Sequence, residues 1–388
     1  MLFSCLPGFG HFNPMMPLAQ AASEAGHEVA FATAERFCRR VIEPAGVAAF
    51  GAGLSPPDVE ARTRRLPEMA SIDDNDVWAF GAHMFARVAA AGKVADLASI
   101  IDEWRPQLVV HDAIDFAAPL AARRAGLRSV AHSFGALQPD SFWALAGELV
   151  SPLWHEWNVA PGPFGSVFDY LYLDICPPSF QADNASGIPV LRPLRPVPYD
   201  LSGAAELPSW VGALPPRPTV YVTMGTIFND TPGVFEAFAT ALADSDVNVV
   251  ITVGLDRDPA ELGSLPANVH VERWIPQSLL FARCHAVVCH GGSGTTLAAL
   301  GHGLPLLLLP QGANQFWNAE RCVALGAGLS VDLDHLDAAT IRQAVHRLLA
   351  TPSFGRTARG IAEEIRQMPA PPDVVPLLEA EAREAAGG

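Results

Sequence analysis

The chain has 388 residues, of which half are hydrophobic and 17% are charged, and its formal net charge is −16. This length favours two domains, each large enough to form its own core. The excess of acidic residues argues against an extended nucleic-acid-binding surface, so any anionic ligand has to be held by local donors.

Other compositional features favour a cytoplasmic enzyme. No secretion signal precedes the first strand-like run, and no apolar run reaches the ~18 residues of a membrane helix. Six cysteines are scattered without CxxC pairs. The cysteines and histidines between residues 284 and 290 do not converge on a metal, because neighbouring strand residues point to opposite faces. We therefore expect no metal site.

Strands and helices alternate through the first 132 residues. The pattern predicts strands at 2–6, 28–33, 47–50, 107–110 and 127–132, and helices at 14–25, 35–45, 77–104 and 116–125. Asn13 suits the N-cap of the first helix, and Pro14 suits its first position. This alternation is typical of right-handed βαβ units, so we expect a parallel sheet.

Two segments of this half lack a clear period. Residues 51–76 are rich in Pro, Arg and Asp, which predicts a loop. Residues 133–180 are rich in aromatic side chains but are interrupted by Pro and Gly. We expect part of this second segment to line an apolar pocket.

A proline-rich stretch at 189–218 predicts the passage to a second α/β domain. The strands expected there are 219–223, 248–253, 269–271, 286–289, 305–309 and 329–331, and the helices are 232–243, 338–350, one ending at 366, and 377–386. The expected divisions are a first domain (1–200), a linker (201–217), a second domain (218–368) and a C-terminal helix that packs back toward the first domain (369–388). We expect two doubly wound, Rossmann-like domains that face each other across a cleft.

Residues 290–296 have the composition of an anion site. Gly291, Gly292 and Gly294 let the backbone approach a ligand, and the helix that follows points unpaired N–H groups toward it. His290 and Thr295 add side-chain donors at the same place. The alternative is a tight turn between strand and helix without a ligand.

Candidate acid–base groups follow the strands of the first domain. His11 and Asp112 each lie just after a strand, where open parallel sheets bind ligands. An imidazole backed by a carboxylate is a general base whose tautomer and charge are held by the acid. Asp115 competes with Asp112 for this role, since either can cap the following helix. In the second domain, Trp274 and Gln277 offer a flat ring and an amide to a nucleobase, although Trp274 suits a core position equally well.

Several motifs carry a resemblance to a known family. GHFNPMMPLAQAASEAGHEV lies near the start and VVHDAIDFAAPLAARRAGL in the middle; WIPQ, HGGSGTT and PQGANQFWNAERC follow in this order. Over nearly its whole length the chain resembles a family 1 glycosyltransferase of the two-domain GT-B fold. The similarity is closest to the actinobacterial natural-product branch of macrolide and enediyne type.

The resemblance implies a role for each motif. His11 would be the base that deprotonates an acceptor hydroxyl, and Asp112 the acid that orients it. Trp274 would stack on the pyrimidine of the donor, Ile275 would read the base edge through its backbone, and Gln277 would lie near the ribose. The residues implied to hold the diphosphate and the sugar are Gly225, Thr226, His290, Gly292, Ser293, Gly294, Thr295, Asn314 and Gln315. The expected acceptor pocket contains Phe9, Phe12, Phe85, Phe134, Phe142 and Trp143.

The implied reaction is an inverting transfer from a nucleoside diphosphate sugar to a hydroxyl of a hydrophobic natural product, as in antibiotic biosynthesis. The helix dipole and neutral donors would take the place of Mg²⁺, and no tightly bound cofactor is implied. Plant relatives carry a Glu for the ribose hydroxyls where this chain has Ala298, and Asn314 replaces the usual acid. Both departures favour a dTDP-linked deoxysugar over UDP-glucose.

Alternative functions remain open. An epimerase or a lipid-linked sugar transferase would share the fold, although no basic membrane-facing helix is evident. A catalytically silent binding or activator protein would lack the base, whereas His11 and Asp112 are both present. A P-loop ATPase fits poorly because GGSGTT has no Lys. We expect a monomer or homodimer with no stable membrane insertion.

Overall fold

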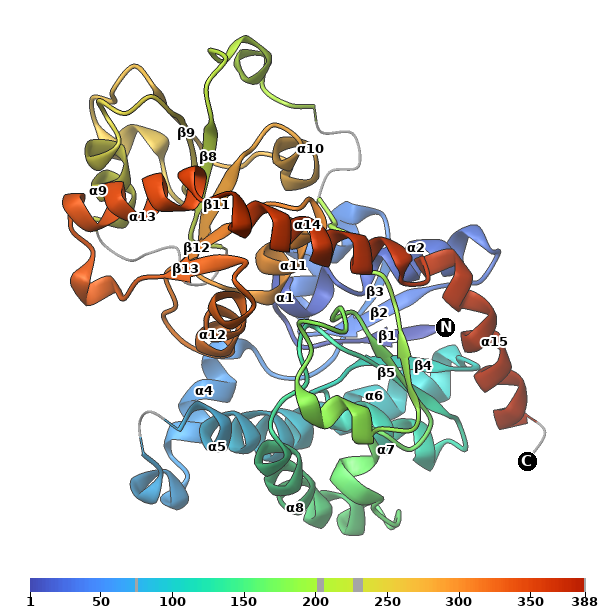
Figure 1. Cartoon of the computed structure of the whole chain (residues 1–388). Helices are drawn as coiled ribbons and strands as arrows, with labels where there is room; N and C mark the ends of the chain where they lie inside the picture. The colour runs from blue at the N-terminus through green and yellow to red at the C-terminus, as the bar shows by residue number, and fades with distance from the viewer. Residues whose placement is uncertain (74–75, 201–205, 226–232, 387–388) are drawn as a thin grey trace. The chain divides into compact units, whose positions relative to one another are not determined.

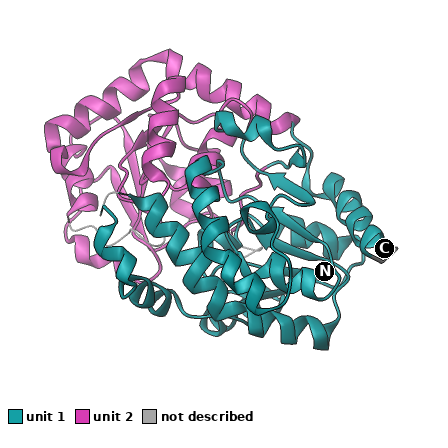
Figure 2. Ribbon diagram, turned by 90° about the horizontal axis from the view of Figure 1, so that it is seen from below, with its two compact units in different colours: residues 1–176, 181–195, 368–388 teal, residues 177–180, 196–367 magenta. Residues whose placement is uncertain are grey.

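The computed structural model describes residues 1–73, 76–200, 206–225 and 233–386. The chain divides into two compact units (Figure 2): residues 1–176, 181–195 and 368–388 form unit 1, and residues 177–180 and 196–367 form unit 2. Each unit is built around one sheet of parallel strands flanked by helices (Figure 1). The predicted α/β class with two doubly wound sheets is confirmed.

The sheet of unit 1 has the strand order β3-β2-β1-β4-β5-β6-β7, with every neighbouring pair parallel. Its strands are β1 (Leu2–Ser4), β2 (Ala30–Thr33), β3 (Ala48–Gly51), β4 (Val109–Asp112), β5 (Ser129–His132), β6 (Leu171–Asp174) and β7 (Leu191–Pro193). The inner strands are buried along their whole length, as expected for a parallel sheet covered on both faces. The order reverses between β1 and β4, so the loops after these two strands flank the crevice at the carboxyl edge.

The helices of unit 1 are α1 (Phe9–Phe12), α2 (Met16–Glu24), α3 (Glu35–Phe37), α4 (Pro56–Arg64), α5 (Val77–Ala82), α6 (Ala90–Trp104), α7 (Ala117–Arg124), α8 (Asp140–Glu156) and α15 (Pro371–Ala386). A π-helical stretch, His83–Ala89, joins α5 to α6, so the long helix predicted at 77–104 is present with one local distortion.

The last helix, α15, belongs to unit 1 and packs on α2. His27 Nε2 lies 3.0 Å from Glu379 Oε1, and Arg128 donates to Glu381 Oε2 at 2.8 Å. Leu378 is fully buried beneath these polar contacts. The final helix therefore returns to the first unit of the chain, as the fold prediction stated.

Unit 2 repeats the same strand order. Its sheet runs β10-β9-β8-β11-β12-β13, all parallel, with the reversal between β8 and β11. The strands are β8 (Thr219–Thr223), β9 (Asn248–Thr252), β10 (Val269–Glu272), β11 (Ala286–Cys289), β12 (Leu306–Leu308) and β13 (Gly328–Ser330). The helices are α9 (Val234–Ala241), α10 (Gln277–Phe281), α11 (Ser293–Gly301), α12 (Gln315–Leu325), α13 (Ala338–Ala350) and α14 (Pro352–Gln367).

The structure corrects three local predictions. The segment 51–76 contains α4, whose N-cap Ser55 accepts from the backbone N–H of Asp58 at 3.4 Å, so the Pro-rich stretch marks a helix start. The segment 133–180 contains the long helix α8, despite Pro152 inside it, and the buried strand β6. Helix α2 begins at Met16, two residues later than predicted, with Met15 at its N-cap.

None of the helices found in the described parts of the chain combines the length and apolar character needed to cross a bilayer.

Candidate active site

His11 and Asp112 meet at the point where the strand order of unit 1 reverses. His11 lies in α1, directly after β1, and Asp112 is the last residue of the neighbouring strand β4. The distance from His11 Nδ1 to Asp112 Oδ2 is 2.6 Å. Asp112 is buried, whereas 21% of the His11 side chain is exposed. The carboxylate thus lies against Nδ1, and Nε2 is the ring nitrogen that would take a proton.

The competing carboxylate, Asp115, is engaged elsewhere. Its Oδ2 accepts from Ser4 Oγ at 2.6 Å and from Lys93 Nζ at 2.7 Å, and the residue is 2% exposed. Burial opposes its ionisation, but the Lys93 ammonium and the two hydrogen bonds outweigh burial, so the pKa of Asp115 lies below its ordinary value. Of the two acids left open by the sequence, the structure brings only Asp112 to His11.

The six aromatic residues expected in an acceptor pocket fall into two groups. Phe12 is fully buried against Phe31 and Phe37, and Phe142 and Trp143 are also core residues. These three therefore have almost no exposed ring surface for a ligand, because they pack against neighbouring aromatic side chains. The partly exposed members are Phe9, Phe85 and Phe134. Of these, Phe134 has its ring centroid 5.0 Å from that of His11.

The loop that carries Phe134 is anchored by a buried carboxyl group that the sequence did not single out. Asp174, at the end of β6, accepts from Gln181 Nε2 at 2.8 Å. The amide oxygen of Gln181 in turn accepts from the backbone N–H of Leu137 at 2.8 Å. Burial raises the pKa of Asp174 to about 6, although the hydrogen bonds that the carboxylate accepts, from Gln181 above all, oppose the shift. The apolar wall beside His11 thus depends on a polar network behind it.

In unit 2, the imidazole of His290 fills the space between two glycines. An added Cβ at Gly225 would lie 2.3 Å from Cε1 of His290, and one at Gly292 would lie 2.4 Å from Nε2. Gly225 follows β8 and His290 follows β11, which are the two strands at the reversal point of this sheet. These glycines are therefore required by the histidine ring itself, in addition to any approach of the backbone to a ligand.

The donors at this place are uncharged. Burial lowers the pKa of His290 to about 4, so the imidazole is neutral near pH 7 and carries one N–H. Helix α11 begins at Ser293 with Gly292 as its N-cap, and the first N–H groups of a helix have no partner within it. Gly294, in that first turn, is exposed. A helix N-terminus beside a neutral imidazole is suited to an anion such as a diphosphate. Thr226, which was predicted to help here, lies outside the described residues.

The segment after β10 presents the residues predicted to bind the nucleoside. Trp274 is partly exposed, and the side chain of Ile275 is buried. Gln277 begins α10, and its Nε2 donates to the hydroxyl of Tyr221 at 3.1 Å. Its backbone N–H donates to Asp200 Oδ1 at 2.9 Å. Neither Tyr221 nor Asp200 is predicted from the sequence to be a partner of Gln277, because Tyr221 lies in an apolar strand and Asp200 in a Pro-rich stretch.

The loop before α12 is joined to the glycine turn through Ser293. Asn314, the N-cap of α12, donates from Nδ2 to Ser293 Oγ at 2.9 Å. Gln315 is buried, and its Oε1 accepts from the backbone N–H groups of Gln311 at 2.8 Å and Gly312 at 3.3 Å. The oxygen of Gln315 is thus committed to the loop, which leaves its NH₂ group as the part available to a ligand.

Within the part of the chain that the structure covers, no three His, Cys, Asp or Glu side chains gather in a way that could hold a metal ion. Asp-x-Asp pairs occur in the sequence, but Asp258 and Asp332 serve as N-caps of short 3₁₀ helices.

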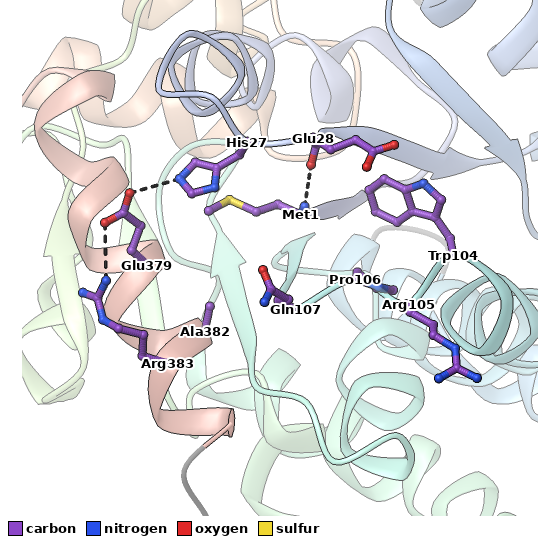
Figure 3. Close-up of a pocket in the computed structure, with 10 residues that line it drawn as sticks. All are labelled: Met1, His27, Glu28, Trp104, Arg105, Pro106, Gln107, Glu379, Ala382 and Arg383. Carbon is purple, nitrogen blue, oxygen red and sulfur yellow. Dashed lines mark hydrogen bonds and ion pairs between the residues drawn. The ribbon is translucent and has the colours of Figure 1, made fainter.

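A pocket of about 610 Å³ lies at the opposite, amino edge of the sheet of unit 1 (Figure 3). Its walls come from residues just before β1, β2 and β4 and from α15. Figure 3 shows several of its polar groups paired: Glu379 contacts both His27 and Arg383, and the Met1 amino group donates to the Glu28 carbonyl at 2.6 Å. Because His11 and Asp112 lie at the carboxyl edge of this sheet, the pocket is separate from them.

This combination of two like-ordered parallel sheets is the fold of the GT-B glycosyltransferases. Two family models match the chain: Erythromycin biosynthesis protein CIII-like, N-terminal domain, over residues 20–225, and the corresponding C-terminal domain over residues 236–381. The chain belongs to this family, which confirms the resemblance read from its motifs, and it is a glycosyltransferase of the natural-product type.

Individual relatives agree with this assignment. L-demethylnoviosyl transferase of Streptomyces niveus is 34% identical over 390 residues, which cover 99% of this chain and 98% of the relative. The glycosyltransferase SnogD from Streptomyces nogalater has a TM-score of 0.81 at 32% identity, with 98% of each chain covered. The spinosyn rhamnosyltransferase SpnG has a TM-score of 0.82 at 29% identity, with 97% and 99% covered.

Proposed function

We propose that the chain is an inverting glycosyltransferase that moves a deoxysugar from a dTDP-linked donor to a hydroxyl group of a hydrophobic natural product. Unit 1 supplies the base, and unit 2 holds the nucleotide sugar. The observation that carries the proposal is the 2.6 Å contact between His11 Nδ1 and Asp112 Oδ2. SpnG has been solved with thymidine diphosphate and with spinosyn aglycone, which supports a dTDP donor and a hydrophobic acceptor.

In the proposed reaction, His11 Nε2 takes the proton of the acceptor hydroxyl while the acceptor oxygen forms a bond to the anomeric carbon of the sugar. The bond from that carbon to the diphosphate oxygen breaks on the opposite face, and the diphosphate leaves with the electron pair. Asp112 balances the charge that appears on the imidazole. His290 and the N-terminus of α11 stabilise the charge on the leaving diphosphate.

Two positions in unit 2 support a dTDP-linked donor. Ala298, within α11, offers only a methyl group where an acidic residue would bind both ribose hydroxyls, and the ribose of dTDP has no 2′-hydroxyl to bind. Asn314 is a neutral amide whose NH₂ group already donates to Ser293, so it grips a hydroxylated hexose less strongly than a carboxylate would.

The test of the base is the variant His11→Ala. We expect it to lower the transfer rate by about 100- to 10,000-fold and to leave the affinity for thymidine diphosphate unchanged, because the nucleotide is assigned to unit 2. His155→Ala is the control, since this exposed histidine also lies in unit 1, near the end of α8. Transfer by His11→Ala at the native rate would remove the proposed base.

The test of the donor is a mass-spectrometric screen of dTDP and UDP sugars side by side against a panel of aromatic and macrocyclic acceptors. We expect faster turnover with dTDP-deoxysugars. A strong preference for UDP-glucose would overturn the donor assignment without affecting the assignment of His11.

A catalytically silent binding protein is less well supported. Such a protein has no use for a partly exposed imidazole paired with a buried carboxylate, since burying an acid is costly unless it serves a partner. His11→Ala again separates the two functions, because a silent protein would be unchanged by it.

A further inference from the structure

Lys93 is the only lysine of the sequence, against 24 arginines. It lies on α6 and is 3% exposed, although lysine is among the residues least often buried. The single lysine thus lies at an interior position, whereas arginine supplies all the other Lys/Arg cations. Its surroundings indicate why a compact ammonium group is needed there.

The ammonium group joins the carboxyl ends of three neighbouring strands. Nζ donates to the carbonyl of Cys5 at 2.7 Å, just after β1, and to the carbonyl of Ala32 at 3.3 Å, in β2. It also donates to Asp115 Oδ2 at 2.7 Å, in the loop after β4. Three donors thus meet three acceptors, and a planar guanidinium group could not match this arrangement.

The same contacts lead to both members of the acid–base pair. Cys5 opens the short loop that ends in α1, where His11 lies. Asp115 closes a turn on Asp112, to whose carbonyl its backbone N–H donates at 2.8 Å. The chain of contacts therefore runs from Lys93 to each of the two loops and closes at the 2.6 Å contact between His11 and Asp112.

The position is also sterically enclosed. Gly53 has φ +88°, and a Cβ there would lie 3.1 Å from Cγ of Lys93, so the loop after β3 packs directly against the stem of the lysine. Ser4 Oγ donates to the same carboxylate oxygen of Asp115, Oδ2, at 2.6 Å. The ammonium group consequently has little freedom to move.

We propose that Lys93, through its ion pair with Asp115, is a positioning residue that sets the separation of the loops carrying His11 and Asp112. It does not touch the substrate. This inference rests on the proposed role of His11 as the base. A displacement of about 1 Å at a reacting group can lower a rate by on the order of 100-fold, so the spacing of the two loops matters for turnover.

The test uses the double variant Lys93→Met/Asp115→Asn, because removing one charge alone would leave its partner buried and unpaired. With the donor and acceptor returned by the screen, we expect kcat to fall by about 10- to 100-fold, with KM for both substrates within about threefold of native. Leu97→Ala is the control: it weakens the same helix by removing core contacts one turn farther along, away from the ammonium group. It should keep kcat within about threefold at a similar loss of Tm.

A second comparison separates positioning from general structural damage. In a His11→Ala background, the double substitution should not lower the residual rate further, because the pair that Lys93 positions is already gone. An equal loss in both backgrounds, or a native kcat in the double variant, would overturn the proposal. A native rate for His11→Ala alone would instead remove the proposed base.

Discussion

Replacing Gly292 by alanine tests whether His290 holds the diphosphate. The backbone of Gly292 (φ −62°, ψ 139°) is one that alanine adopts freely, so the substitution carries no backbone strain. The new Cβ would lie 2.4 Å from Nε2 of His290, whereas ordinary contact begins near 3.4 Å. The imidazole therefore has to move by about 1 Å, so the main effect of the substitution is to displace the ring of His290.

The size of the effect follows from the hydrogen bond that this movement breaks. A hydrogen bond to a charged group contributes about 1.5–3 kcal/mol. Since about 1.4 kcal/mol is a factor of ten in affinity, Gly292→Ala should bind thymidine diphosphate about 10- to 150-fold more weakly. Isothermal titration calorimetry near pH 7.5 measures this directly, without any knowledge of the acceptor.

Two controls make the result specific to His290. Gly301→Ala adds the same methyl group to the same helix, but its Cβ would lie 3.8 Å from Ile365, which is ordinary contact, so affinity should not change. In a His290→Ala background, Gly292→Ala should have no further effect, because there is no ring to displace. Native affinity in Gly292→Ala, or an equal loss in both backgrounds, would refute the role given to His290.

Three further outcomes can be measured on the same protein. Gln315→Glu keeps an oxygen for the backbone N–H groups of the loop but loses its NH₂ group, so Tm should hold while KM for the sugar donor rises and affinity for thymidine diphosphate does not change. Ala313 has φ 52°, and Ala313→Gly should raise the free energy of unfolding by about 0.5–1 kcal/mol in urea titrations; a fall would show that this strain is absent. His132 and His290 are buried and neutral, with pKa values of about 4, so the unfolded chain binds protons below pH 6.5 that the folded chain does not. Stability should therefore fall between pH 6.5 and 4 by about 3 kcal/mol for each histidine, partly offset by Asp174, and flat urea midpoints over this range would contradict these values.

The sequence predicts the fold well where the hydrophobic pattern of a segment agrees with the burial of that segment in the structure. Strands such as β8 and β11 are short, fully buried apolar runs bounded by turn residues, so their pattern has one reading. Helix α8 escaped prediction because its apolar face includes large aromatic residues and Pro152 interrupts the pattern, although tertiary packing still holds the helix. Packing of this kind overrides local preference and has no signature within the segment.

The acid–base pair can be predicted because topology alone brings it together. His11 and Asp112 each follow a strand, and a parallel sheet places such ends at one edge. Lys93 cannot be predicted in this way, since it lies within a helix, where a lysine is usually exposed. Its burial depends on three strand ends and on the loop at Gly53.

The glycines of unit 2 show a related limit. Gly225 and Gly292 suggest a close approach of backbone to ligand, which is the common reason for glycine near an anion site. Only the structure shows that the space a Cβ would need is taken by the ring of His290. The residue type alone therefore does not distinguish room for a ligand from room for the histidine ring.

Each unit has its candidate site where the strand order of its sheet reverses, but the electrostatic requirements of the two sites differ. In unit 1 the proposed base, His11, would become charged during the reaction, and the buried carboxylate of Asp112 lies 2.6 Å from it, with the Lys93–Asp115 pair behind. In unit 2 the ligand would bring its own charge, and the chain as a whole is at −16. A buried cation there would have to be desolvated before any ligand arrived, at a cost of several kcal/mol. A neutral imidazole and the N–H groups of α11 avoid that cost and still place partial positive charge where the diphosphate would leave, which is why burial of His290 suits its proposed role.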